Sequence, residues 1–294
     1  MVEGISIGKR VFSAGNYIFL CLLALSCLLP IVHVMAVSLS SAEAAGAGAV
    51  KLWPVKFTLS SYEYVLQDDG FLRAFGITVQ RVLVGTALNL ALIVLTAYPL
   101  SKETSAFLFR TAIAWYYVFT ILFGGGLIPF YMTVKMTGLI DSLWALIIPG
   151  AVPVFSVLLM LNFFRGLPKE LVEAAFIDGA GHMTVLWRIF VPLSKPALAT
   201  IALFSMVGHW NSWFDGLILM NNPEHYPLQS FLQNMVIKQD FLTANESDIQ
   251  LLKLLSDRTL KSALIFLGTL PILLVYPFLQ KYFMKGIVLG SVKE

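Results

Sequence analysis

The residues best suited to bind a small polar molecule lie together in one apolar stretch of the chain. Trp210 and Trp213 are three residues apart, and Asn211 and Asp215 are four apart, so each pair would share a face of a helix. Aromatic rings stack on the apolar face of a sugar ring, while amide and carboxylate groups bind hydroxyls. This spacing predicts part of a ligand path. An aromatic belt at a membrane interface is the alternative that the same pattern leaves open.

Arg81 is a second candidate because it interrupts another long apolar run, in which Asn89 follows two helical turns later. An ionisable residue inside a membrane span is costly and is therefore a functional candidate. Three roles remain open for Arg81: its side chain could reach the outer membrane interface, pair with an acid on a partner subunit, or contact an acidic ligand.

The composition indicates the element that must position these residues. The chain has 294 residues, of which 58% are hydrophobic and 13% charged, and its mean hydropathy is +0.80. A soluble domain carries roughly 25% charged residues. We therefore predict an all-α integral membrane protein that forms one transmembrane domain over residues 1–294.

Six apolar stretches are long enough to span a bilayer, which takes about 20 residues each. The first is too long for the core of a cleaved signal peptide and is predicted to be a retained span. The predicted spans are residues 15–39, 73–98, 110–133, 142–164, 196–220 and 259–281.

The side chains that commonly hold metals or nucleotides show no suitable spacing. Cys21 and Cys27 lie six residues apart within the first span and would point to different faces of it. The four histidines are scattered, and Gly8-Lys9-Arg10 has Arg where a phosphate-binding loop needs Ser or Thr. We predict no cofactor in this chain, no catalytic residue and no ATPase site of its own.

A polar loop, residues 165–195, interrupts the membrane pattern between the fourth and fifth spans. Pro168 suits the first position of a helix, and Gly179 suits the left-handed residue just beyond the end of that helix. Gly181 precedes a second short helix, which Pro192 is expected to end. The pattern predicts a compact helical projection whose small residues allow another surface to approach closely.

Six spans place both termini on one side of the membrane. If that side is the cytoplasm, eleven Lys and Arg residues fall on inner segments and seven on outer ones, which supports cytoplasmic termini. The outer segment 40–72 is predicted to contain a short helix capped by Ser60. The outer segment 221–258 is predicted to contain amphipathic stretches at Leu228–Ile237 and Ile249–Leu255.

The loop motif, Glu-Ala-Ala at 173–175, Asp-Gly-Ala at 178–180 and Ile-Phe-Val-Pro-Leu at 189–193, resembles the cytoplasmic coupling loop of ABC-importer permeases. The resemblance extends over essentially the whole chain and is strongest to the six-span carbohydrate branch, similar to the smaller maltose permease subunit. Within that branch, Phe123–Tyr131 and the run from Trp210 to Asp215 look most like the second permease subunit of alginate importers.

This resemblance implies a type I importer fold and a multi-pass protein of the bacterial inner membrane. It implies ATPase-coupling roles for seven loop residues and a place for the fifth span in the substrate path. The coupling residues would be Glu173, Ala174, Ala175, Asp178, Gly179, Gly181 and Pro192. It also implies that the tail, residues 282–294, contacts the ATPase pair through an extended apolar piece.

The implied partners are a second permease subunit, two ATPase subunits that carry ATP and Mg, an extracytoplasmic solute-binding protein and an oligosaccharide substrate, with no nucleic acid. Two alternatives of other classes remain. An ion-coupled secondary transporter would need acids near the bilayer midplane, where the spans offer few. A non-transporting membrane scaffold would use the loop only as a docking site.

Overall fold

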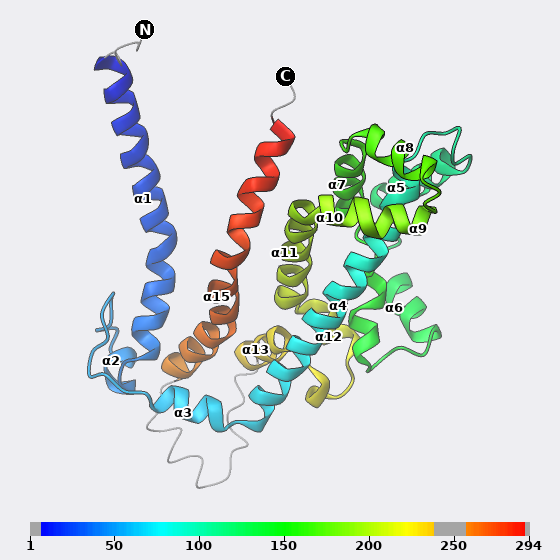
Figure 1. Cartoon of the computed structure of the whole chain (residues 1–294). Coiled ribbons are helices and arrows are strands. Elements are labelled where there is room, and N and C mark those ends of the chain that lie inside the picture. Colours follow the sequence, from blue (N-terminus) through cyan, green and yellow to red (C-terminus); the bar gives the residue numbers. More distant parts are fainter. Residues whose placement is uncertain (1–6, 238–256, 292–294) are drawn as a thin grey trace. The chain divides into compact units, whose positions relative to one another are not determined.

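The computed structural model describes residues 7–237 and 257–291 of the chain (Figure 1). The chain divides into two compact units. The first combines Met1–Asp69 with Met235–Leu270, and the second combines Gly70–Asn234 with Pro271–Glu294. Across the described residues the structure is helical, apart from one isolated bridge between Ser40 and Phe57.

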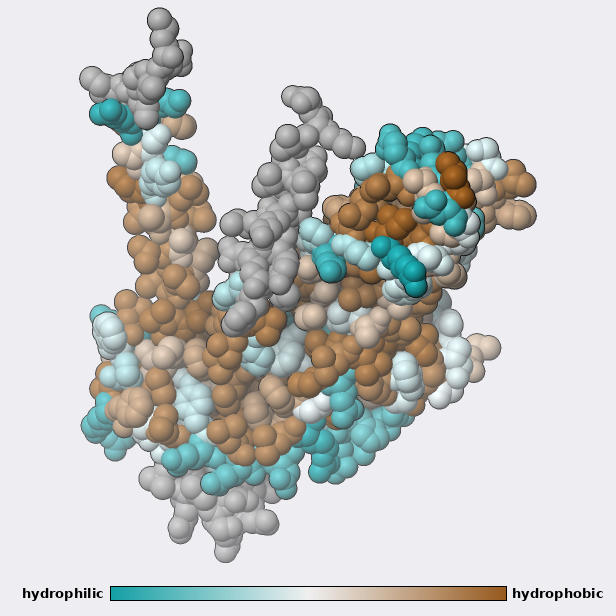
Figure 2. Space-filling model, viewed as in Figure 1, coloured by the Kyte–Doolittle hydropathy of each residue, from teal (hydrophilic) through white to brown (hydrophobic). Residues whose placement is uncertain are grey.

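The first unit holds three complete helices and the beginning of α15 (Asp257–Ser291): α1 (Ile7–Ser38), α2 (Ala42–Gly46) and α3 (Ser60–Gln67). Helix α1 is apolar along most of its length, as Figure 2 shows, and is exposed over its first two thirds. Its end packs into a small core of alanines and valines with α2. The hydroxyl of Tyr62 on α3 forms a hydrogen bond of 2.6 Å with Ser38 Oγ, and the Tyr62 ring lies edge-on to the ring of Phe266.

The second unit is built on the long helix α4 (Asp69–Ser101), which packs on α7 (Val154–Arg165) and α11 (Lys195–Asn211). Fully buried Ile93, Met160 and Ile201, one from each helix, lie in the same core. The other elements of this unit follow in chain order. They are α5 (Arg110–Leu122), α6 (Leu127–Met136), η1 (Leu143–Leu146), η2 (Ile148–Gly150), α8 (Lys169–Ile177), α9 (His182–Val185), η3 (Leu186–Phe190), α10 (Val191–Leu193), α12 (Phe214–Leu219), η4 (Pro223–His225) and most of α13 (Leu228–Ile237).

Three helices of the described chain are long and apolar enough to cross a membrane, and the number rises to six if each of three bent pairs is one span. The bends measure 119° between α5 and α6, 49° between the η1–η2 segment and α7, and 80° between the α9–α10 segment and α11. Each of the six apolar stretches predicted from sequence overlaps one of these helices or pairs. Their limits in a bilayer stay a prediction.

The sharpest bend lies at the three consecutive glycines 124–126. Gly126 has a φ of +87°, a value that residues with a side chain rarely adopt, and it stands immediately before α6. Within the described parts of the chain, no atom lies within 4 Å of a Cβ built on Gly124 or Gly126. The left-handed φ of Gly126 therefore accounts for a glycine at the turn of the backbone.

Three local expectations need correction. The fifth apolar stretch, 196–220, is two helices, because α11 ends at Asn211 and α12 begins at Phe214. The tail is helical as far as Ser291, where an extended piece was expected. Ser60 is the first residue of α3, and Leu59 occupies the cap position. Helix α13 matches the expected stretch Leu228–Ile237, whereas Ile249–Leu255 lies outside the described residues.

Candidate functional site

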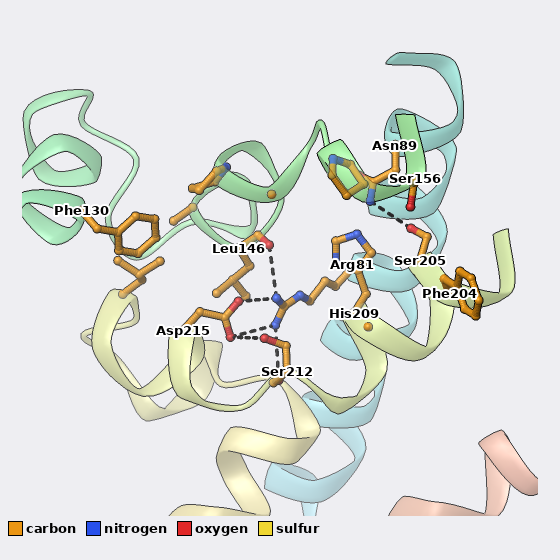
Figure 3. A pocket seen from close by; sticks show the side chains of 16 residues that line it. Arg81, Asn89, Phe130, Leu146, Ser156, Phe204, Ser205, His209, Ser212 and Asp215 are labelled. Atoms are coloured by element: carbon orange, nitrogen blue, oxygen red, sulfur yellow. Dashed lines mark hydrogen bonds and ion pairs between the residues drawn. The ribbon is translucent and has the colours of Figure 1, made fainter. Parts of the chain in front are cut away.

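A pocket of about 420 Å³ opens within the second unit (Figure 3). Its walls come from α4, α6, the η1–η2 segment, the start of α7 and the α11–α12 break. The lining side chains include charged, amide, hydroxyl and aromatic groups: Arg81, Asn89, Phe130, Ala145, Leu146, Pro149, Gly150, Pro153, Ser156, Phe204, Ser205, Gly208, His209, Ser212, Asp215 and Leu219.

Arg81 lies at the centre of the pocket and is 2% exposed. Its two terminal nitrogens donate to the two carboxylate oxygens of Asp215, and they also reach the carbonyls of Leu146 at 3.3 Å and Ser212 at 3.5 Å. The guanidinium thus ties α4 to η1 and to the α11–α12 break. Its ionic partner is an acid of the same chain, which corrects the expectations of an interfacial or intersubunit role.

The break between α11 and α12 places Asp215 in this position. Ser212 leaves the helical conformation with a ψ of 121°, and α12 restarts at Phe214. Asp215 Oδ1 then accepts hydrogen bonds from Ser212 Oγ at 2.8 Å and from the Gly216 amide at 2.9 Å. A carboxylate in the first turn of a helix also complements the helix dipole.

A second polar contact joins α4 to α11 further along the pocket. Asn89 donates from Nδ2 to Ser205 Oγ at 3.0 Å, and Asn89 is 4% exposed. His209, 8% exposed, packs its ring against Gly85 so closely that a Cβ there would lie 2.5 Å from Nε2. Gly85 is therefore required for α4 and α11 to approach at this point.

Two of the five residues predicted for the ligand path line this pocket, Arg81 and Asp215. Trp210 is 7% exposed and packs edge-on against Phe75, with 5.8 Å between ring centroids. Trp213 is 42% exposed and lies beside the Phe214 ring, and Asn211 is exposed. Because the helix is interrupted after Asn211, the shared faces expected from a continuous helix do not form. A role for these three residues in transport stays a prediction.

Sequence reasoning singled out Asn89 as a polar residue in an apolar span but gave no role to Ser156, Ser205 or His209. The usable signal was weak. Each is a single polar residue in an apolar helix, and serines at such positions often bond to their own backbone. Only the packing of α4 on α11 brings Asn89 and Ser205 together.

The polar loop begins with α8, whose first residue, Lys169, directly follows Pro168; Pro168 is thus at the cap and not at the first helical position. The far end of α8 is closed as expected from Gly179, whose φ is +81°. Gly179 N donates to Phe176 O at 3.0 Å and Ala180 N to Ala175 O at 2.9 Å. These two bonds form a Schellman cap.

The second half of the loop differs slightly from expectation. Gly181 occupies the cap position of α9, and the following helix passes through a π-type turn at η3. Pro192 lies inside α10, which ends one residue later at Leu193, immediately before the 80° bend into α11. Pro192 lacks an N–H and cannot donate a helical bond, which agrees with the end of the helix one residue later.

The surface of the loop combines small, acidic and apolar side chains. Glu173, Ala174, Asp178 and Gly179 are exposed, while Ala175 is half-buried against the core. Apolar side chains are also exposed there: Leu171, Phe176, Ile177 (86%), and Met183 (64%). Figure 2 shows hydrophilic side chains over the same end of the second unit. An apolar group among polar ones on an exposed helix is typical of a surface that another protein covers.

An aromatic cluster fixes the loop to the end of α4. Lys102 Nζ lies 4.4 Å from the ring centroid of Tyr98, 4.6 Å from that of Phe190 and 5.9 Å from that of Phe176. Tyr98 OH is 3.1 Å from His182 Nδ1. Burial lowers the pKa of Lys102 from its ordinary value. We call these residues the Lys102 cluster.

Two polar contacts add to this junction. Arg165 donates to the carbonyl of Leu100 at 3.3 Å, and Lys169 forms an exposed ion pair with Glu103 at 2.6 Å. Figure 1 shows α7, α8 and α9 gathered at this end of α4. The helix that carries Arg81 and Asn89 in the pocket is therefore the helix to which the loop is fixed.

A buried polar pocket between broken helices, together with a projecting helical loop, defines a multispan membrane permease. The model of the family of inner-membrane components of binding-protein-dependent transport systems matches residues 89–288, and the chain belongs to this family. It is the permease subunit of an ABC transporter, an assignment that does not favour the ion-coupled or scaffold alternatives.

Related proteins match nearly the whole chain. Protein LplC of Bacillus subtilis is 41% identical over 97% of this chain and 95% of its own length. The polygalacturonan/rhamnogalacturonan transport system permease protein YtcP of the same organism is 38% identical over 97% of this chain and 99% of its own. The structure of a bacterial ABC transporter involved in the import of the acidic polysaccharide alginate contains a chain that matches with a TM-score of 0.88. That chain is 34% identical, over 96% of this chain and 100% of its own length.

Proposed function

We propose that this permease forms half of the translocation path for an acidic oligosaccharide. Two relatives support this substrate class: the polygalacturonan/rhamnogalacturonan permease and the chain from the alginate importer are both named for acidic polysaccharides, and each matches at least 96% of this chain. Alginate and polygalacturonan both consist of uronate sugars, which carry one carboxylate per residue. A maltodextrin permease of Bacillus subtilis matches 95% of this chain at the lower identity of 28%.

The proposed assembly contains a second permease subunit, two ATPase subunits with ATP and Mg, and an extracytoplasmic solute-binding protein. This chain makes and breaks no covalent bond in that scheme. The ATPases close on ATP, and the loop between α7 and α11, seated on one of them, moves with them. The exposed apolar and small residues of α8 support this docking, because they have a surface suited to close contact.

The Lys102 cluster supports the next step, in which motion of the loop reaches α4. Since α4 also carries Arg81 and Asn89, a displacement of the loop would displace one wall of the pocket. The loop faces the cytoplasm in this proposal, and both termini lie on the same side, in agreement with the distribution of Lys and Arg.

Reconstitution of the full transporter in liposomes tests this function. Uptake and ATP hydrolysis are measured with a panel of oligosaccharides of equal length, some built of uronates and some neutral, each with the matching binding protein. We expect uptake of the uronate oligosaccharides and stimulation of ATP hydrolysis by them. Uptake of only the neutral sugars would refute the substrate class, and absence of any ATP-dependent uptake would refute the proposed assembly.

A further inference from the structure

Two buried side chains of the pocket each keep a polar atom without a hydrogen-bond partner within the described parts of the chain: Arg81 Nε and Asn89 Oδ1. Both residues are less than 9% exposed. Buried polar atoms in proteins are nearly always hydrogen-bonded, because leaving them without a partner costs free energy. Two such atoms on residues that line one pocket indicate that a polar molecule belongs there.

The kinds of group that line the pocket narrow the chemistry of that molecule. Arg81 Nε can only donate a hydrogen bond, Asn89 Oδ1 can only accept one, and Ser205 Oγ can do both. A ligand that satisfies them must carry donors and acceptors at several separate positions. The hydroxyl groups of a sugar have this property, as water molecules do, whereas a metal ion and a lipid chain do not.

One aromatic ring completes the site. Phe130 on α6 lies on a wall of the pocket in Figure 3 and is 37% exposed. An exposed ring offers a flat apolar surface to the C–H face of a pyranose. The volume of about 420 Å³ falls in the range of small-molecule sites, roughly 300–1,000 Å³.

The charge of the pocket suits transport better than tight binding. Asp215 accepts one hydrogen bond from each terminal nitrogen of Arg81, so the pair is neutral. The carbonyls of Ser212 and Leu146 take the other two terminal N–H groups, and only the Nε–H remains for a ligand. An unpaired buried guanidinium would hold a uronate carboxylate strongly. A permease must release its ligand in every cycle, and a neutral pair that leaves one donor is compatible with release.

We propose that this pocket is a saccharide-binding subsite of the translocation path. It holds one sugar residue through Asn89, Ser205 and the Nε–H of Arg81, while Phe130 covers an apolar face of the sugar. The proposal rests on the proposed function and adds a site on this subunit.

The first experiment compares Asn89→Leu with Thr86→Val, both in the assembled transporter. Thr86 is a matched control because it lies on α4 three residues before Asn89, is 5% exposed, and its hydroxyl also lacks a partner among the described residues, yet it does not line the pocket. We expect Asn89→Leu to lower oligosaccharide uptake about 5- to 150-fold, the loss of one hydrogen bond to a buried group. Thr86→Val should stay within about threefold of wild type. Equal losses in the two variants, or no loss in Asn89→Leu, would overturn the proposal.

The second experiment measures occupancy directly. Cys21 and Cys27 are the two cysteines of the chain, so replacing them with alanine leaves a background for Ser205→Cys. We expect a small methanethiosulfonate reagent to label Cys at position 205 several-fold more slowly when the transported oligosaccharide and binding protein are present. A non-transported oligosaccharide should give no protection.

The outcomes of the labelling experiment separate the subsite from the substrate class. Uptake of a uronate oligosaccharide with an unchanged labelling rate would refute the subsite and leave the proposed function intact. Uptake and protection by neutral sugars alone would refute the acidic substrate and leave the subsite intact.

Discussion

Substitution of Gly179 tests the loop, because the structure separates the backbone strain of a side chain at this position from its bulk. A side chain there would be strained by the φ of +81°, which costs about 1–2 kcal/mol for an ordinary L-residue. A Cβ would nevertheless meet no atom of the described residues within 4 Å. Whole domains are stable by about 5–15 kcal/mol, so Gly179→Ala and Gly179→Asn should fold and assemble. Asn tolerates the left-handed conformation better than Ala and therefore isolates the effect of bulk.

If α8 seats closely in an ATPase subunit, the added bulk must be accommodated at that surface. Overpacking a close-fitting contact costs about 1–3 kcal/mol, or about 5- to 150-fold in uptake. We expect Gly179→Asn, and more so Gly179→Asp, to lose uptake in that range while basal ATP hydrolysis of each assembled complex persists.

The assay is uptake in proteoliposomes, normalised to assembled complex. Gly138→Asn is the matched control, since Gly138 has a φ of +70°, equally open surroundings and a position outside the loop. Normal uptake in Gly179→Asn and Gly179→Asp, or an equal loss in Gly138→Asn, would refute close docking at this glycine.

Three further predictions concern other contacts. A hydrogen bond from His225 is the main cause that lowers the pKa of Asp141. The contribution of the ionised Asp141 to stability is therefore complete above the ordinary Asp pKa of about 4 and is lost as pH falls through the lowered pKa. Asp141→Asn should reduce this change in melting temperature at acid pH, and an unaltered pH profile would contradict the prediction. Lys102→Met keeps the apolar stem but loses cation–π contacts worth about 0.5–2 kcal/mol, so hydrogen exchange in the loop should become faster, which equal exchange rates would disprove. Trp210→Ala should cost about 3–5 kcal/mol because the ring is buried, and Trp213→Ala much less; thermal unfolding of the complex decides, and equal losses would count against this account.

The loop could be predicted closely from sequence because its signals are local. A proline before a helix and a glycine after it act through the backbone of neighbouring residues, and both lie within one residue of their expected positions. The end of the second helical segment likewise falls one residue beyond Pro192. Local rules specify the presence of a boundary more reliably than its exact residue.

The pocket could not be predicted in the same way, because its contacts are distant in sequence. Arg81 and Asp215 are 134 residues apart, and Asn89 and Ser205 are 116 apart. The helix also breaks at Ser212 and Trp213, and neither position holds a proline or glycine that would predict a break. Because the sequence predicted one continuous helix, Trp210 and Trp213 were assigned to one face of it, and Ser205 was given no role.

The neutrality of the Arg81–Asp215 pair has an electrical consequence. Moving one elementary charge through a membrane potential of 100 mV requires about 2.3 kcal/mol. A lone arginine on α4 would make each conformational change of the protein sensitive to voltage, whereas the paired side chains move together as a dipole of zero net charge. For a uronate substrate, the electrical work of import against an inside-negative potential would then be set by the carboxylates of the cargo and not by this pair.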